Sequence, residues 1–172
     1  MRRSLLNALP IALLLAGTLA CRTSPELEPD EFGAQPTAEL AWKCFLEVNR
    51  RGIKEVDLGI YDEASRALLR RRPNTDASQD EIARLFTGAA YEIRQLADRA
   101  AIVFPEDTDH RLAPWFFHRT GAGWVLDGAA LPPVIGYNHR NQWRFKTVDH
   151  PYAFAFEEWH IDRQGVATYR PQ

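Results

Sequence analysis

The apolar positions of this chain follow a helical period in the first half of the sequence and a two-residue period in the second half. In the first predicted helix, Glu39, Lys43 and Glu47 stand four residues apart, and their charges alternate in sign. They lie on a different face from the apolar residues. Gly52 follows as a natural C-terminal stop. The pattern predicts a first helix whose inward residues are Leu40, Ala41, Cys44, Phe45 and Val48.

A second helix is predicted after a segment, residues 53–60, that is ambiguous between a short helix and a turn. Asp62 is a residue type that caps helix N-termini, and Pro73 ends the helical pattern. The basic run 70–72 stands in the last turn, where the helix dipole favours positive charge. This run is interpreted either as a solvated helix end or as an anion site. The residues expected to face inward are Ala64, Ala67 and Leu68.

A third helix is predicted from the strongest amphipathic pattern in the chain. Ser78 and Glu81 form a capping box ahead of it. The pattern runs through Gly88, which weakens a helix by up to about 1 kcal/mol relative to alanine. The predicted helix extends to Ala97, with the inward residues Ile82, Leu85, Phe86, Ala89, Ala90, Ile93, Leu96 and Ala97.

From Asp98 onward the apolar positions alternate, as in strands. The sequence Thr120-Gly121-Ala122-Gly123 supplies the glycines of a tight hairpin, and a second turn is predicted over 162–165. Pro132 and Pro133 interrupt the sheet, which predicts a long loop over 131–140. Strands are predicted over 100–104, 115–119, 124–127, 141–148, 152–161 and 166–170. Helices followed by antiparallel strands predict an α+β fold.

The first twenty residues have the composition of a secretory signal. Arg2 and Arg3 precede an apolar, uncharged run over 5–20 that is too short to span a membrane. Cys21 follows directly. Cleavage before Cys21 is therefore predicted, with residues 1–20 as the signal peptide.

Gly17-Thr18-Leu19-Ala20-Cys21 resembles the lipobox of bacterial lipoproteins, in which the cysteine is acylated and becomes the new N-terminus. Thr18 stands where that family usually has leucine, and Leu19 where it prefers a small residue. Thr18 and Ala20 also satisfy the rule for an ordinary cleaved signal, which remains the alternative. The resemblance implies a lipid anchor at Cys21 in the bacterial cell envelope. Arg22, in place of aspartate, favours the outer membrane, facing the periplasm.

The remaining chain divides into a tether and one domain. Residues 21–36 carry prolines and acidic side chains, a mixture that favours an extended, flexible segment. Residues 37–172 have the usual length of a single domain. Without residues 1–20 the chain has 19 basic and 23 acidic side chains, with no clustered basic face for nucleic acid. Cys44 is the only other thiol, so an acylated Cys21 leaves no intramolecular disulfide.

Part of this domain, residues 37 to about 130, resembles the NTF2-like (SnoaL-like) superfamily. The likeness consists of three helices before antiparallel strands, the segment 62–66, and the sequence Gly123-Trp124-Val125-Leu126-Asp127 after the hairpin. It implies a cone-shaped fold, in which the N-terminal helices pack on a curved antiparallel sheet and the two enclose a cavity. Members of this superfamily range from isomerases and dehydratases to binding and assembly modules, so the fold alone does not choose a function.

The predicted strand 152–161 carries the candidate ligand site. Alternation places Tyr152, Phe154 and Phe156 on one face, and Trp143 is the centre of the preceding strand. Apolar walls with a polar rim are typical of organic ligand sites. The simpler interpretation is that these aromatic residues form core beneath the helices.

The candidate catalytic residues are Glu158, His160 and Asp127. Glu158 and His160 lie on the same face of the predicted strand and would form a general base pair, although a solvated strand end has the same pattern. Asp127 is comparable to the carboxylate bases of steroid-isomerase-like members of the superfamily. The spacing of the five histidines fits no compact metal signature, and there is no phosphate-binding loop. No metal and no cofactor are predicted.

Two functions from different classes follow. The first is a non-catalytic, membrane-anchored module whose partner is an envelope protein or a small apolar ligand. The second is a small-molecule enzyme of isomerase, dehydratase or hydrolase type that uses acid and base residues inside the cone. The first is favoured because no catalytic motif is present.

Overall fold

The computed structural model describes residues 32–170, so the predicted signal, Cys21 and the first part of the predicted tether lie outside the described residues. Residues 32–36 belong to the folded body. Phe32 is buried in the core, and its carbonyl accepts a hydrogen bond from the Ile60 backbone N–H at 3.0 Å. Gln35 forms a backbone bridge to Trp124. The tether predicted over 21–36 therefore overlaps the fold at its end.

The first helix, α1 (Ala38–Arg50), forms as its pattern predicts. Thr37 caps it by accepting a hydrogen bond from the Leu40 N–H at 3.2 Å, and Gly52 adopts a φ of 64° just beyond its end. Four of the five predicted inward residues are buried. Leu40 is the exception, because it lies at the edge of the stripe and is 44% exposed. Residues 53–60 contain turns and no helix.

The second helix, α2 (Glu63–Arg71), is capped by Asp62 as predicted. The prediction of its inward face was wrong. Ser65 is the buried residue, whereas Ala64 is exposed. The first turn attaches to the sheet through hydrogen bonds of Ser65, which an apolar periodicity does not predict, and Leu69 packs partly buried against the first core cluster.

The third helix is shorter than predicted. α3 (Asp76–Phe86) is capped by Thr75 and Ser78, not by Ser78 and Glu81. Gly88 adopts a φ of 79° two residues after its end, and the chain then enters β1 (Glu92–Leu96). The predicted extension to Ala97 was wrong because the apolar residues of a half-buried strand happen to continue the helical spacing.

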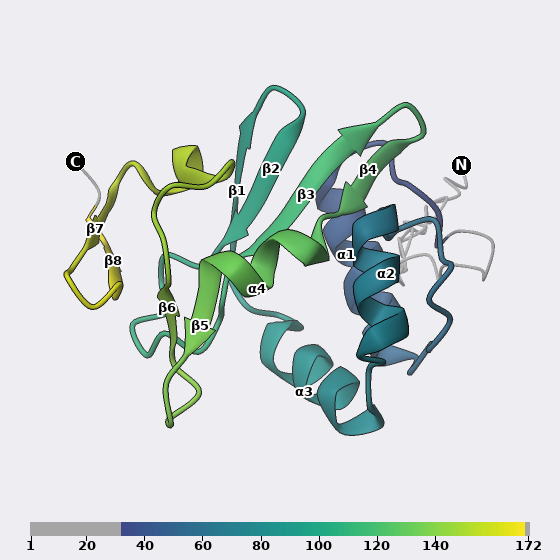
Figure 1. The fold of residues 1–172 in the computed structure, drawn as a ribbon, viewed down its shortest axis with the longest axis horizontal. Helices are drawn as coiled ribbons and strands as arrows, with labels where there is room; N and C mark the ends of the chain where they lie inside the picture. Colours follow the sequence, from purple (N-terminus) through teal and green to yellow (C-terminus); the bar gives the residue numbers. More distant parts are fainter. Residues whose placement is uncertain (1–31, 171–172) are drawn as a thin grey trace, which may run out of the picture.

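A four-stranded antiparallel sheet forms the centre of the fold, in the order β1-β2-β3-β4 (Figure 1). Its other strands are β2 (Arg99–Val103), β3 (Trp115–Thr120) and β4 (Gly123–Leu126). The last three match the predicted strands. Gly123, at the hairpin between β3 and β4, has a φ of 133°. Within residues 32–170, four α-helices and antiparallel sheets of four, two and two strands confirm the α+β class.

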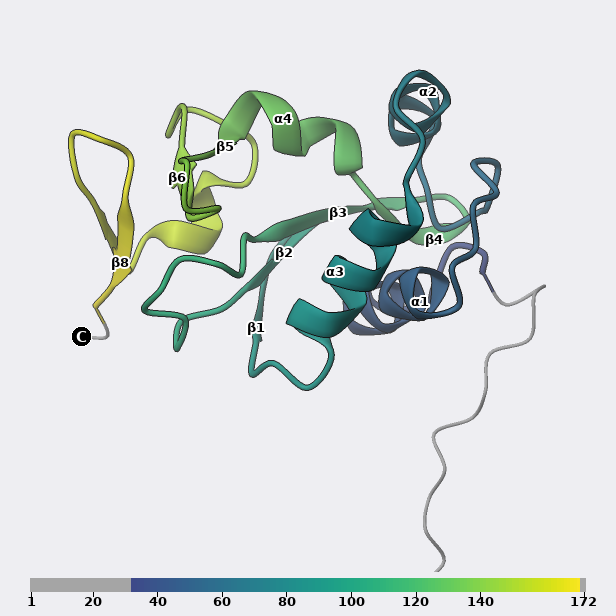
Figure 2. The ribbon, with the colours of Figure 1, turned by 90° about the horizontal axis from the view of Figure 1, so that it is seen from below.

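Both faces of this sheet are covered, as Figure 2 shows. Helices α1 and α3 pack on one face, where Ala100, Ile102 and Phe117 join the first core cluster. The C-terminal half of the chain packs on the other face, where Ala101 and Phe116 join the second cluster. Burial on both sides explains the unbroken apolar run of β2.

The C-terminal half departs most from its predicted elements. The loop expected over 131–140 contains a short helix, α4 (Leu131–Val134), and the strand β5 (Ile135–Tyr137), which pairs with β6 (Trp143–Phe145). The two prolines stand in the first turn of α4, where no backbone N–H is needed. The strand predicted over 141–148 is limited to β6.

The prediction of one long strand over 152–161 was also wrong. Its first part is a 3₁₀ turn, η3 (Ala153–Phe156), and only β7 (Trp159–Ile161) is a strand, paired with β8 (Ala167–Tyr169). Tyr152, Ala155 and Phe156 are buried, which is helical spacing rather than alternation. A second 3₁₀ turn, η2 (Gly128–Ala130), links β4 to α4. Within residues 32–170, no helix is long and apolar enough to cross a membrane.

Candidate functional site

The aromatic residues of the predicted ligand site are part of the core. Trp143, Tyr152 and Phe156 are buried in the second core cluster, with 0 to 4% of their surface exposed, and Phe154 packs partly buried against them. The Tyr152 ring stacks on Phe116, with centroids 4.3 Å apart and planes within 4°. The four aromatic residues thus pack as core, as the simpler interpretation expects, but on the face of the sheet opposite α1 and α3 rather than beneath those helices.

Glu158 and His160 are not brought together as an acid–base pair. Glu158 accepts a hydrogen bond from Arg94 at 2.9 Å, and Arg94 also lies 2.6 Å from Glu92. The Tyr169 hydroxyl donates to Glu158 at 3.4 Å. His160 is exposed on β7. Glu158 thus acts as the ion-pair partner of Arg94, across the space between β1 and the C-terminal hairpin.

Asp127, the third candidate, does lie in a cluster of polar side chains. It follows β4 and caps η2, because its Oδ1 accepts a hydrogen bond from the Ala130 N–H at 3.2 Å. Its Oδ2 accepts a hydrogen bond from the Tyr152 hydroxyl at 2.6 Å. The side chain is 16% exposed. One carboxylate oxygen is therefore used by the backbone, and the other faces the cluster.

Asp62 reaches the same place from the start of α2. Its Oδ1 accepts a hydrogen bond from the Ser65 N–H at 2.7 Å and so caps the helix. Ser65 then fastens the helix to the sheet, because its hydroxyl donates to the Leu126 carbonyl at 3.2 Å and accepts from the Gly128 N–H at 2.7 Å. The two capping carboxylates, Asp62 and Asp127, are thereby held at the same end of β4.

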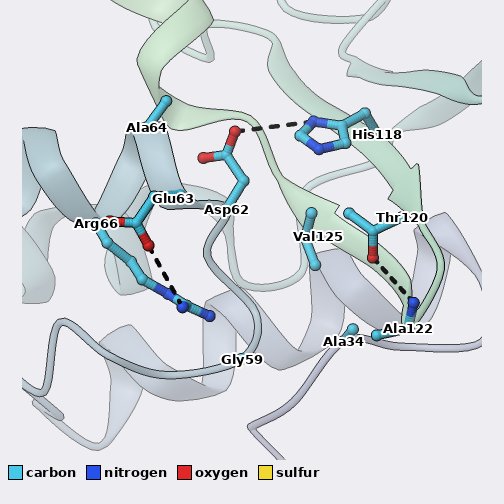
Figure 3. Close-up of a pocket in the computed structure, with 10 residues that line it drawn as sticks. All are labelled: Ala34, Gly59, Asp62, Glu63, Ala64, Arg66, His118, Thr120, Ala122 and Val125. Carbon is cyan, nitrogen blue, oxygen red and sulfur yellow. Dashed lines mark hydrogen bonds and ion pairs between the residues drawn. The ribbon is translucent and has the colours of Figure 1, made fainter.

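His118 lies between these two carboxylates. It stands on β3, with Val125 of β4 and Arg99 of β2 as its cross-strand neighbours. Its Nδ1 is 3.7 Å from Asp127 Oδ2 and 4.0 Å from Asp62 Oδ2. Figure 3 shows the imidazole directed toward the Asp62 carboxylate. All three side chains are mostly buried, at 24% exposed for His118 and 15% for Asp62.

Tyr152 and Arg99 complete the cluster on the side of the C-terminal segment. Arg99 Nη1 lies 4.0 Å from Asp127 Oδ2 and donates to the Tyr152 hydroxyl at 3.4 Å. Its guanidinium also lies over the Tyr152 ring, 5.4 Å from the centroid. Burial, with the hydrogen bond to Asp127 as a further cause, raises the pKa of Tyr152 far above its usual range. The phenol therefore stays protonated and serves as a hydrogen-bond donor.

An open pocket of about 470 Å³ adjoins this cluster. Asp62 and His118 line it at one side, and Arg66 and Thr120 line it elsewhere (Figure 3). Val125 and several alanines supply its apolar wall. The pocket thus joins a small apolar surface to an imidazole and a carboxylate that are positioned by secondary structure.

Two carboxylate oxygens face the imidazole, and one of them, Asp127 Oδ2, also accepts a hydrogen bond from the Tyr152 hydroxyl. A neutral histidine carries at most one proton on Nδ1, yet two carboxylate oxygens face that atom. One possible ligand atom from each of Asp62, His118 and Asp127 lies within 4.8 Å of the other two. Two unit charges at that separation repel by about 3 kcal/mol at an effective dielectric constant of about 20. Such an arrangement suits a proton shuttle, a hydrogen-bonding ligand or a cation.

Sequence reasoning missed His118 as a site residue and assigned Asp62 only a capping role. The available signal was a histidine directly after the aromatic residues of a strand, three residues before Gly121 of the hairpin that sets its register against Val125. The convergence of Asp62 and Asp127 depends on how α2 attaches to β4, which no local pattern contains. Comparisons with family models, curated proteins and solved structures found no match to this chain.

Proposed function

We propose that this chain is a lipid-anchored protein of the bacterial cell envelope whose folded part binds a small polar ligand beside α2. The anchor would be the acylated Cys21, with the protein on the outer membrane facing the periplasm. The signal-like residues 1–20 and the lipobox-like sequence before Cys21 support this location. Binding would be non-catalytic in this first candidate.

The fold supports a distant relation to the NTF2-like superfamily as a further part of this proposal. In both, N-terminal helices lie against an antiparallel sheet whose strands follow them in sequence. The chain would differ from the cone of that superfamily in its C-terminal half. There, α4 and the two small hairpins fill the second face of the sheet with side chains from the second core cluster.

The observation that carries the binding proposal is the position of His118 in the pocket wall. His118 and Asp62 line the pocket, and both are held by elements that the backbone fixes, a central strand and a helix cap. Rigid placement of a few polar groups beside an apolar wall is what ligand recognition requires. The proposed ligand site is therefore this pocket rather than the aromatic residues of the C-terminal segment.

A second candidate is an acid–base enzyme, favoured by the 3.7 Å separation of His118 Nδ1 and Asp127 Oδ2. In such a pair the carboxylate orients the imidazole and stabilises its protonated form, and the other ring nitrogen exchanges a proton with a substrate. Asp127 would then be a positioning residue rather than the base itself. Isomerisation, dehydration and hydrolysis all use a proton transfer of this kind.

The anchor is tested by labelling cells with palmitate and by fractionating the Cys21→Ala variant. We expect label on the wild-type chain, and we expect the variant to leave the membrane fraction. A chain that carries no label, or a Cys21→Ala variant that stays membrane-bound, contradicts the anchoring.

The pocket is tested by native mass spectrometry of the full chain purified from its own envelope. Ala64 is exposed and lines the pocket, so Ala64→Trp fills it without entering the core. Arg71→Trp, at the exposed far end of α2, is the matched control. We expect a bound small molecule on the wild type and on Arg71→Trp, but not on Ala64→Trp. Equal spectra for all three, or a bound protein in place of a small molecule, contradict the pocket.

The same measurement separates binding from catalysis. After the bound molecule is identified, it is incubated with the wild type and with His118→Gln. If the protein binds the molecule without converting it, we expect the mass of the molecule to stay unchanged with both proteins. A product formed by the wild type and not by His118→Gln supports the enzyme instead.

A further inference from the structure

We infer that Asp62, His118 and Asp127 form a binding site for a divalent transition-metal ion, with Zn²⁺ the best match. This inference deepens the proposed function, on which it rests, because it names the ligand that the wall of the pocket would hold. The donors are Asp62 Oδ2, His118 Nδ1 and Asp127 Oδ2. They come from three different elements, the cap of α2, the strand β3 and the end of β4.

The two carboxylates are already oriented for this role. Each uses Oδ1 as a helix cap, with the Ser65 N–H 2.7 Å from Asp62 and the Ala130 N–H 3.2 Å from Asp127. These hydrogen bonds leave both Oδ2 atoms directed at the imidazole. Outer-shell hydrogen bonds of this kind fix the ligating atoms of known metal sites.

Charge and protons also favour a cation between the three donors. Two carboxylates face the same imidazole nitrogen, at 3.7 and 4.0 Å, and they repel each other across His118. Arg99 is 4.0 Å from Asp127 Oδ2 and offsets part of the negative charge on that side only. A divalent ion would neutralise both carboxylates.

The separations fit a small ion once the two aspartate side chains close around it. Nδ1 lies 3.7 and 4.0 Å from the two oxygens. Around tetrahedral zinc, with bonds of about 2.0 to 2.1 Å, neighbouring donors are about 3.3 Å apart. The imidazole distances need to shorten by about 0.4 to 0.7 Å, and the two carboxylate donors, which lie within 4.8 Å of each other, by up to about 1.5 Å, through rotation of both aspartate side chains. The fourth position would face the pocket that Asp62 and His118 line.

The donor types select the class of ion. Imidazole nitrogen suits zinc and other late first-row metals, whereas Mg²⁺ and Ca²⁺ prefer sites made wholly of oxygen. Three protein ligands with an open fourth position is the pattern of zinc sites that also bind water or substrate. The Tyr152 hydroxyl, 2.6 Å from Asp127 Oδ2, competes for that oxygen but can remain hydrogen-bonded to it as an outer-shell donor.

The test is calorimetric titration of Zn²⁺ into the full, untagged chain in detergent, after treatment with a chelator. The variants Asp62→Asn and Asp127→Asn remove charge and keep an Oδ1 atom for each cap. Asp127→Asn also replaces the oxygen that accepts a hydrogen bond from Tyr152, so its stability is measured beside its metal binding. His118→Gln removes the nitrogen donor. His160→Gln, at an exposed histidine of β7, is the matched control.

We expect one Zn²⁺ per chain for the wild type and for His160→Gln. We expect binding to weaken at least about 100-fold in His118→Gln and Asp127→Asn, since even an outer-shell partner is worth about 10- to 100-fold. Arg99→Gln is expected to bind several-fold more tightly, because it removes the competing positive charge. Thermal unfolding without metal identifies any variant that fails to fold, and such a variant is replaced by His118→Asn or Asp127→Ser.

The inference is overturned if the wild type binds no Zn²⁺, or if folded His118→Gln binds it as tightly as the wild type does. Failure here is distinguishable from failure of the pocket. A chain that binds no Zn²⁺ but carries a small molecule that Ala64→Trp displaces retains the proposed function and loses only the metal.

Discussion

The Tyr152 hydroxyl donates a 2.6 Å hydrogen bond to Asp127 Oδ2, and this contact ties the C-terminal segment to the end of β4. The tyrosine ring is fully buried and stacked on Phe116 of β3. The bond therefore connects the second core cluster to the polar cluster around His118. The orientation of the Asp127 carboxylate therefore depends on the packing of the second core cluster.

Removal of that hydroxyl is expected to weaken the fold measurably. Tyr152→Phe keeps the stacked ring but loses a hydrogen bond to a charged group, which is worth about 1.5 to 3 kcal/mol. Urea unfolding followed by tryptophan fluorescence measures the change. Tyr169→Phe is the control, because its hydroxyl makes only long contacts of 3.4 and 3.5 Å. Equal stability of the Tyr152→Phe variant and the wild type contradicts the assigned bond.

Trp42 is expected to be the most costly core residue to remove. It is fully buried on α1 and has six aromatic rings around it, with centroids 5.6 to 6.5 Å away. Truncation of a buried tryptophan to alanine costs about 3 to 5 kcal/mol. The free energy of unfolding of Trp42→Ala checks this. Leu96→Ala, at a residue that is 59% exposed, should change it by less than about 0.5 kcal/mol. A loss for Trp42→Ala as small as that of Leu96→Ala contradicts the first core cluster.

Gly165 and Gly52 provide a matched pair of glycines with positive φ, at 82° and 64°. A Cβ on Gly165 would lie 2.1 Å from the Phe145 carbonyl oxygen, whereas a Cβ on Gly52 has open space. Gly52→Ala should cost about 1 to 2 kcal/mol for the backbone conformation alone. Gly165→Ala should cost about 3 kcal/mol or more, because the Phe145 N–H also loses its hydrogen bond to Gly165. Similar melting temperatures for the two variants would show that β6 and the last turn do not meet as described.

Glu47 contributes to stability in a way that depends on pH in the acidic range. Hydrogen bonds from Arg50 and Arg51, partly opposed by burial, lower the pKa of Glu47 to about 2. Because the pKa of Glu47 is lower in the folded protein than in the unfolded chain, where it is near 4.5, the ionised carboxylate stabilises the fold at pH values above 4.5. That contribution disappears as the pH falls toward 2. The contribution should be about 1 kcal/mol, since Arg50 is more than half exposed.

The difference in free energy of unfolding between the wild type and Glu47→Gln isolates this effect from the other carboxyl groups. We expect the difference to be constant from pH 7 to about 5 and to shrink between pH 4.5 and 2. A difference that stays constant down to pH 2 contradicts the ion pairs of Glu47.

The sequence predicted the helices and strands that carry their own start and stop signals. α1 has a regular stripe followed by Gly52, and β3 and β4 flank a glycine hairpin. The prediction of the end of α3 failed, because the apolar residues of the following strand also fit a helical period. Ile93 of β1 continues the helical spacing of α3 across Gly88, and the positive φ of Gly88 ends that continuity.

The candidate site was less predictable than the fold, because it depends on contacts between residues far apart in sequence. Asp62 was predicted as a cap and Asp127 as a candidate acid or base, but neither pattern contains the attachment of α2 to β4 through Ser65. The spacings between the five histidines predicted no metal site. The cluster in the structure contains one histidine and two aspartates, and spacings between histidines cannot predict such a combination.

X-ray absorption spectroscopy of the full chain, loaded with one equivalent of Zn²⁺, most directly tests the central claim that Asp62, His118 and Asp127 meet at one functional centre. We expect a first shell of one imidazole nitrogen with oxygen donors and no sulfur, and we expect the imidazole signal to disappear in His118→Gln. A shell containing sulfur or several imidazoles, a signal unchanged in His118→Gln, or a chain that retains no zinc would contradict the claim.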